Sequence, residues 1–231
     1  MNRKYRKPSV TTMPQRLALS FIFGVSILVI ATPSVAEAGV IFTNFGPGLT
    51  YDINSGNPVG NAFDGNDWAE ANAFTPTVSG SLQSLRLALS CAFICPQSFG
   101  VSLTADNADQ PGLVLESFVL AGGTLGPIGI NNPPLLLLSV LHPSLIAGTR
   151  YWVAVGAGLA DSVSWNLNTT GDVSDQAISS DNGATWFSPS GNTPGALEVD
   201  ATTVAPEPGS FALLVGAGLL VSLVDRRRRS A

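Results

Sequence analysis

Two cysteines, Cys91 and Cys95, lie four residues apart in the segment CAFIC and are the only cysteines of the chain. We expect a disulfide that closes a small loop, because the two chain ends described below predict export of the body and disulfides form in oxidising compartments outside the cytoplasm. So short a loop stabilises the fold only modestly in the loop-entropy model. Two unpaired buried thiols are the alternative. A metal site is not expected, because the two thiols and the single distant histidine, His142, do not complete a ligand set.

Two short segments, DGND and DNAD, concentrate oxygen-bearing side chains. Their carboxylates belong to Asp64, Asp67, Asp106 and Asp109, and Ca²⁺ prefers oxygen ligands of this kind. Neither segment has the spacing of an EF-hand loop, and Asp and Asn in turns usually hydrogen-bond their own backbone. We therefore expect no cofactor and keep Ca²⁺ as a weak alternative.

The four tryptophans suggest a second kind of binding site. Trp152 lies in a strongly apolar run and is expected in the core, whereas Trp68, Trp165 and Trp186 stand beside polar residues. Aromatic faces can stack on sugar rings, although packing is the commoner use of Trp in a domain of this size. Carbohydrate contact at these three positions is an alternative hypothesis.

The acidic residues are numerous, but no pair is marked out for catalysis. Residues 39–205 contain thirteen acidic side chains, and hydrolysis of a glycosidic bond needs two of them in defined positions. The sequence also lacks a G-x-S-x-G segment and a phosphate-binding glycine loop. We predict that the protein is not an enzyme, and a glycoside hydrolase is the least favoured alternative.

The charge distribution excludes one large class of function. Residues 39–205 contain only two basic side chains, Arg86 and Arg150, against the thirteen acidic ones. Such a surface cannot neutralise a phosphate backbone, so nucleic acid is not an expected partner. The shortage of basic groups also limits unselective attachment to acidic polymers.

Short strands are expected to position these side chains. The 24 Gly and 16 Pro are spread through the chain, and between them apolar residues alternate with polar ones. This alternation predicts strands over residues 81–90, 100–104, 114–120, 151–155, 162–166 and 196–202. Turn-forming segments such as Asp181-Asn182-Gly183 separate them. Many short strands without a helical period predict an all-β fold, a single jelly-roll-like β-sandwich over residues 39–202.

Two of these runs predict which side chains share a face. In the first run, Leu82 falls out of phase with Leu85 and with the leucines that follow it. In the third run, Val114 is expected on the same face as Phe118, because successive side chains of a strand point to opposite faces.

The N-terminal end has the order of a secretory signal peptide. Residues 1–16 are basic, and residues 17–31 form an uncharged apolar run. Ala36-Glu37-Ala38 has the A-x-A form of a cleavage site, with Ser34-Val35-Ala36 as a second candidate. The apolar run is short for a permanent span of the roughly 30 Å hydrocarbon layer. We predict a cleaved signal helix over residues 1–38, and an uncleaved anchor is the alternative.

The C-terminal end combines three features in order. The tripeptide Pro206-Glu207-Pro208 is followed by the uncharged apolar residues 209–224 and then by four arginines, Arg226, Arg227, Arg228 and Arg229. The prolines keep the chain extended before the apolar segment, and the arginines are expected on the cytoplasmic side of a membrane. This order predicts a linker over residues 203–208 and a transmembrane anchor over residues 209–231. An ordinary membrane anchor with a proline-rich stalk is the alternative.

These three parts together resemble the PEP-CTERM sorting signal, over residues 206–231. The resemblance implies that exosortase, a membrane-embedded enzyme, recognises Pro206, Glu207 and Pro208. It also implies that the apolar segment is a transient anchor and that the arginine cluster is a stop signal. Proteins of this kind are typical of Gram-negative bacteria that make exopolysaccharide and grow in biofilms.

The body resembles a second family, the choice-of-anchor extracellular domains, most closely their R type. The resemblance spans roughly residues 40–200 and is carried by residues 68–76, 101–106, 145–153, 164–166 and 181–186. It implies an extracellular β domain without established catalytic activity.

We therefore expect an exported protein that passes through the general secretion machinery and, transiently, the inner membrane. It would then reach the cell surface or the extracellular matrix. Its expected role is structural or adhesive within an exopolysaccharide or biofilm layer. A carbohydrate- or calcium-dependent binding module is the main alternative.

Overall fold

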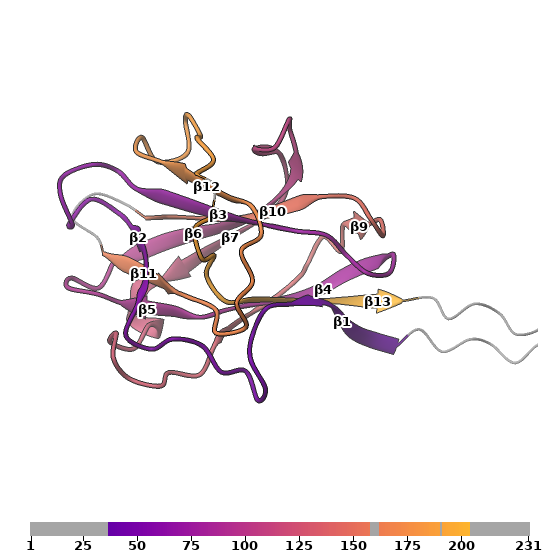
Figure 1. Ribbon diagram of the computed structural model, residues 1–231, viewed down its shortest axis with the longest axis horizontal. Coiled ribbons are helices and arrows are strands. Elements are labelled where there is room, and N and C mark those ends of the chain that lie inside the picture. Colours follow the sequence, from indigo (N-terminus) through magenta and orange to yellow (C-terminus); the bar gives the residue numbers. More distant parts are fainter. Residues whose placement is uncertain (1–36, 158–161, 190, 204–231) are drawn as a thin grey trace, which may run out of the picture. The chain divides into compact units, whose positions relative to one another are not determined.

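The computed structural model describes residues 37–157, 162–189 and 191–203, which form an all-β domain (Figure 1). The strands are β1 (Glu37–Thr43), β2 (Gly56–Val59), β3 (Ala69–Phe74), β4 (Gly80–Leu87), β5 (Leu89–Cys91), β6 (Ser98–Asp106), β7 (Pro111–Ala121), β8 (Leu135–Leu138), β9 (Ser144–Leu145), β10 (Tyr151–Ala157), β11 (Val163–Asn166), β12 (Gln176–Ser179) and β13 (Leu197–Thr203). In the described ranges the helical structure is one 3₁₀ turn, Gly122–Thr124. None of their helices has the length and apolar character needed to cross a bilayer. The all-β class predicted from the sequence is confirmed.

The strands form three antiparallel sheets. The first sheet has the order β1-β13-β4-β8, with β9 also pairing with β4. The second sheet has the order β12-β3-β10-β6-β7, and the third has the order β2-β11-β5. Most strands that pair within a sheet are far apart in the sequence. Only the paired strands β6 and β7, in the second sheet, follow each other directly. Strands β8 and β7 stand last in the order of the first and second sheets and are edge strands.

A β-bulge explains the position of Leu82. In the pairing of β4 with β13, Ser84 lies opposite Asp200 and Leu82 lies opposite Ala201, which leaves Gln83 without an opposing residue. An extra residue in one strand reverses the alternation beyond it. Leu82 thereby returns to the inner face, where it is fully buried together with Leu85.

A second bulge corrects the prediction for Val114. Strand β7 pairs Glu116 with Leu103 but Val114 with Thr104, so Leu115 is the extra residue. Phe118 still packs against the core, whereas Val114 turns to the outer face and is half exposed. The predicted strand is present, but its first residues face the opposite way.

The main apolar core lies between the sheets and receives side chains from all three of them. Leu85 of the first sheet, Val153 of the second and Trp165 of the third belong to one cluster of buried side chains. Fully burying one such side chain contributes about 1.5–3 kcal/mol. The alternating runs of the sequence therefore account for most of the core.

The two ends of the described chain lie side by side. Glu37, at the start of β1, pairs with Thr203, at the end of β13 (Figure 1). The strands thus extend slightly beyond the predicted domain of residues 39–202. The described chain therefore begins and ends at the same end of the first sheet.

Candidate functional site

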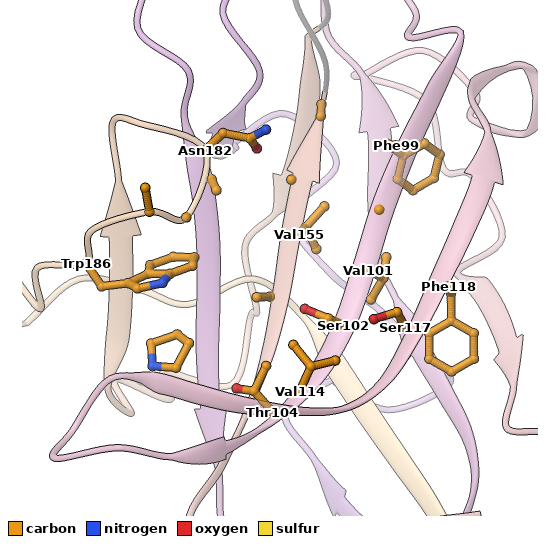
Figure 2. A pocket seen from close by; sticks show the side chains of 18 of the residues that line it. Phe99, Val101, Ser102, Thr104, Val114, Ser117, Phe118, Val155, Asn182 and Trp186 are labelled. Carbon is orange, nitrogen blue, oxygen red and sulfur yellow. The ribbon is translucent and has the colours of Figure 1, made fainter. Parts of the chain in front are cut away.

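A groove of about 840 Å³ lies on the outer face of the second sheet, the face turned away from the main core (Figure 2). Strands β6, β7 and β10 supply its floor, and the turn 182–186 after β12 supplies one wall. None of the described residues that line the groove carries a charge. Amides, hydroxyls and one indole are its polar groups.

The floor is low because small residues lie next to one another across three strands. Ala154 of β10 pairs with Ser102 of β6, which pairs with Ser117 of β7. One pair further along, Gly156 lies opposite Gly100. Exposed positions of an antiparallel sheet usually carry larger polar side chains. These small residues instead leave the backbone of the sheet accessible.

Trp186 forms the wall of the groove. Trp186 packs against a cluster of buried side chains on the outer face, which contains the buried Trp152 and four alanines, Ala71, Ala73, Ala154 and Ala177. Its carbonyl oxygen accepts a hydrogen bond from Nε2 of Gln110 at 2.9 Å. Figure 2 shows Trp186 on one side of the groove, with Ser102 and Ser117 between it and Phe118. Trp186 is therefore held in place while part of its surface faces the groove.

The turn that carries this wall is rigidly built around Asp181. The hydroxyls of Thr185 and Ser179 each donate a hydrogen bond of 2.7 Å to the Asp181 carboxylate. These bonds, with the N–H of Thr185, lower the pKa of Asp181 to about 2. Asn182 and Gly183 both have positive φ angles, 55° and 87°, which Asn and Gly adopt most readily. The Asp-Asn-Gly turn predicted from the sequence is confirmed.

Trp68, the second candidate for carbohydrate contact, lies outside the groove. Its indole N–H donates a hydrogen bond of 2.8 Å to Asp64, and its side chain is half-buried. The N–H groups of Asn66 and Trp68 together lower the pKa of Asp64. Trp68 and Asp64 thus stabilise a local turn.

Trp165, the third candidate, must be removed from the list of carbohydrate contacts. Its side chain is fully buried in the core, and its indole N–H donates to the carbonyl of Ala196 at 3.0 Å. Gly195 leaves room for the ring, since a Cβ there would lie 2.2 Å from Trp165 Cδ1. A residue in this position cannot contact a polymer at the surface.

The four candidate calcium ligands have separate partners. Asp106 accepts a hydrogen bond of 2.7 Å from the indole of Trp152, and Asp109 forms an ion pair with Arg150. Asp64 is bound within its own turn, and one carboxylate oxygen of Asp67 is buried without a partner. In the part of the chain that the structure describes, no three His, Cys, Asp or Glu side chains are grouped to hold a metal ion.

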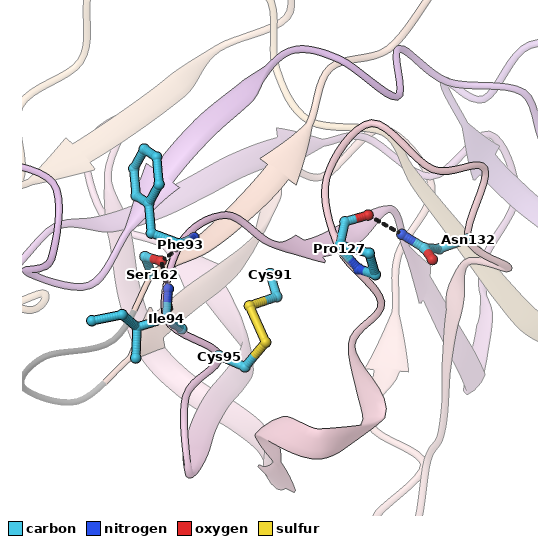
Figure 3. Close-up of a disulfide and its surroundings, with 7 residues drawn as sticks. All are labelled: Cys91, Phe93, Ile94, Cys95, Pro127, Asn132 and Ser162. Atoms are coloured by element: carbon cyan, nitrogen blue, oxygen red, sulfur yellow. Dashed lines mark hydrogen bonds between the residues drawn. A yellow bond between two sulfur atoms is a disulfide. The ribbon is translucent and has the colours of Figure 1, made fainter.

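Cys91 and Cys95 form a disulfide that closes the loop after β5 (Figure 3). The hydroxyl of Ser162 accepts hydrogen bonds from the backbone N–H groups of Phe93 and Ile94, at 2.8 and 2.9 Å. The loop is therefore fixed to the segment that leads into β11. None of these residues lines the groove.

Two buried carboxylates lie on the inner face of the second sheet. Burial alone would raise the pKa of Glu116, but hydrogen bonds from Ser139, Leu141 and Val140, and the nearby His142, lower it. These three bonds measure 2.6–3.0 Å and connect β7 to the loop after β8.

The other carboxylate, Glu70 of β3, has a different environment. It is 1% exposed, and burial raises its pKa well above the usual value. Oε1 of Glu70, Oδ1 of Asn72 and both side-chain polar atoms of Gln176 are buried without hydrogen-bond partners. This polar cluster lies beneath the sheet and does not reach the groove.

The groove floor was missed in the sequence, although its signal was present. Residues 100–104 read GVSLT, and the alternation of Val101 with Leu103 places these two side chains on one face of the predicted strand. The intervening residues, Gly100, Ser102 and Thr104, then had to form the outer face. A run of small residues on that face is the signal for an open floor.

The predicted sorting residues, Pro206, Glu207, Pro208 and the arginine cluster 226–229, lie outside the described residues, as does nearly all of the predicted signal peptide. No protein-family model and no curated protein matches this chain.

Proposed function

We propose that this chain is an exported surface or matrix protein whose β domain binds a polysaccharide in the groove beside Trp186. The observation that carries the proposal is the uncharged groove itself. An indole wall offers an apolar face to a sugar ring, and the hydroxyls of Ser102 and Ser117 on the floor can exchange hydrogen bonds with sugar hydroxyls. Binding grooves commonly combine one aromatic surface with a few polar groups that fix orientation.

The same groove favours binding over hydrolysis. Glycosidases place two carboxyl groups on either side of the scissile bond, about 5–10 Å apart. The described lining of the groove contains no Asp or Glu, so it offers neither a general acid nor a nucleophile. A structural or adhesive role within an exopolysaccharide layer fits this lining better than a role in degrading the layer.

The finer architecture that we propose is a jelly-roll-like β-sandwich. Two five-stranded sheets contribute to one apolar cluster, and pairings such as β4 with β13 join distant parts of the chain. In this architecture the outer face of one sheet is free for a ligand.

The proposed route to the surface uses both chain ends. A signal peptide would direct export through the general secretion machinery of a Gram-negative bacterium. Exosortase would then recognise Pro206, Glu207 and Pro208 near the inner membrane. Two features support this proposal. The disulfide fits an oxidising compartment, and Thr203 ends a strand three residues before the tripeptide.

Binding is tested with the full chain, purified in a zwitterionic detergent that carries no sugar. Electrophoresis through gels that contain soluble polysaccharides should show retarded migration of the wild type. The variant W186A should lose this retardation, whereas W68A should keep it, because Trp68 lies outside the groove. Two results would overturn the proposed function. One is equal retardation of W186A and the wild type, and the other is that no polymer, among several with different backbones, retards the wild type.

Sorting is tested by mass spectrometry of both termini of the protein recovered from producing cells. The expected product begins at residue 37 or 39 and has lost the arginine cluster. Replacement of Glu207 by Ala should retain a longer, membrane-bound form. Unchanged release of that variant would count against recognition of the tripeptide.

A further inference from the structure

We infer that the groove accepts uncharged polysaccharides and rejects acidic ones. This inference rests on the proposed function, because it specifies the substrate class of the same site. Three observations carry it: both arginines of residues 39–205 are ion-paired in the described ranges, carboxylates stand at the borders of the groove, and neutral hydrogen-bonding groups on the floor are unoccupied.

The arginines of the domain are already engaged. Arg86 forms an ion pair of 2.5 Å with Glu198 and lies 3.8 Å from Asp200. Arg150 pairs with Asp109 and, at 2.7 Å, with Asp175. No other Arg or Lys occurs in residues 39–205. The carboxylate of an acidic sugar would lose hydrating water on binding. Neither arginine is free to compensate for this loss with an ion pair.

Carboxylates stand beside three of the residues that line the groove. Asp106 precedes Asn107 of the lining, and Asp181 precedes Asn182. Asp109 precedes Gln110, but its charge is partly neutralised by Arg150. The hydrogen bonds from Thr185 and Ser179 lower the pKa of Asp181 to about 2, so its carboxylate is charged at neutral pH. Like charges repel over about 30 Å at 0.01 M salt and over only about 3 Å at 1 M.

The neutral groups are free to bind. No hydrogen bond joins the side chains of Ser102, Ser117 or Asn182 to any other residue in the described ranges. Asn182 stands over the floor, since a Cβ at Gly156 would lie 2.8 Å from its Oδ1. Hydroxyl and amide groups of this kind match the donors and acceptors of an uncharged sugar.

The test compares polymers that share a backbone and carry either neutral or acidic substituents. Hydroxyethyl cellulose is paired with carboxymethyl cellulose, and methyl-esterified pectin with pectate, in gels at 0.01 M salt. The neutral member of any pair that binds should retard the full chain about tenfold more strongly than the acidic member. Raising the salt should reduce this difference. Equal retardation, or stronger retardation by the acidic member, would overturn the inference while leaving the proposed function intact.

A charge-gain variant provides the sharper test. S117R places a cation on the groove floor, and S117Q provides a polar side chain of related length without charge. S117R should reduce the ratio of retardation by the neutral polymer to retardation by the acidic polymer several-fold. S117Q should keep this ratio even if both polymers bind more weakly. An unchanged preference in S117R would contradict an electrostatic basis for selection. A third outcome is that no polymer retards the chain, while an extended peptide binds to it and this binding depends on Trp186. That outcome would overturn both proposals and assign the groove to a protein partner.

Discussion

The two faces of the second sheet reverse the usual distribution of charge. The inner face, packed against the core, holds the carboxyl groups of Glu70 and Glu116. The groove on the outer face, open to water, has no charged residue in its described lining. Solvent contact tolerates charge and burial penalises it. The absence of charge from the described lining of the groove therefore does not follow from solvation, which is why we assign the groove a function.

The two carboxyl groups on the inner face differ in their hydrogen-bond partners. Glu116 accepts hydrogen bonds from three donors, and its pKa is lowered. Glu70 retains an oxygen without a partner, and its pKa is raised. A buried carboxylate can therefore fasten two elements together or remain a source of instability, depending on whether donors reach it.

The largest effect is expected from Glu116→Gln. This change replaces charge-assisted hydrogen bonds by neutral ones and should reduce the free energy of unfolding by about 2–3 kcal/mol at pH 7. Because the folded pKa lies below the ordinary 4.5, the stabilisation is present above pH 4.5 and is lost as the pH falls through the folded pKa. Urea unfolding between pH 3 and 8 measures both effects. A variant as stable as the wild type at pH 7 would show that the three bonds contribute little.

The next effect concerns the outer face. Ser117→Trp should fill the floor of the groove and weaken polysaccharide binding about tenfold or more, equivalent to about 1.4 kcal/mol. Leu138→Trp is the matched control, because Leu138 is an exposed residue of β8 in the first sheet. Gel retardation of the two variants measures the difference. Equal loss in both would mean that the groove is not the binding site.

Glu70→Gln should act in the opposite direction from Glu116→Gln. Because burial raises the folded pKa of Glu70, its neutral form is favoured in the fold. Stability from this site is then fully present below pH 4.5 and is lost as the pH rises towards the folded pKa. The variant should be more stable than the wild type by about 1–2 kcal/mol at pH 8 and should show little gain at pH 4. Thermal unfolding at the two pH values checks this, and a loss of stability at pH 8 would indicate that an ionised Glu70 has partners.

The smallest effect is expected when a charge is added to the outer face. Ser117→Asp should change the free energy of unfolding by less than about 0.5 kcal/mol, because Ser117 is exposed and has no close charged neighbour in the groove lining. In the Ser117→Asp variant, the affinity for an acidic polymer should fall further than the affinity for a neutral polymer. A large loss of stability would mean that packing, rather than ligand selection, keeps this face uncharged.

The six predicted segments correspond to β4 with β5, β6, β7, β10, β11 and β13 and supply much of the core, because alternation follows directly from strand geometry. The first segment divides into β4 and β5, which belong to different sheets, and β1, β2, β3, β9 and β12 were not among the predicted segments. The sequence pattern placed Leu82 and Val114 on the wrong faces, since a bulge depends on the register between strands that are distant in the sequence. It also left Trp165 open to contact with sugar because Ser164 and Asn166 flank it. Both neighbours are buried, as β2 and β5 cover β11 on both edges.

The candidate site was only partly predictable. Trp186 was named from its polar surroundings, and the structure places it at the groove. The floor was not identified, because it requires the pairing of three strands that the sequence does not reveal. Periodicity determines which residues share a face, but the register between strands determines which faces join to form a surface.

Hydrogen exchange can locate the bound polymer on the domain. The full chain is compared with and without the soluble neutral polysaccharide that retards it most strongly. Slower exchange should appear in residues 182–186 and 111–119, and exchange in β4 and β13 should stay unchanged. Protection confined to the turn around Trp68 or to the first sheet would contradict a binding site in the groove.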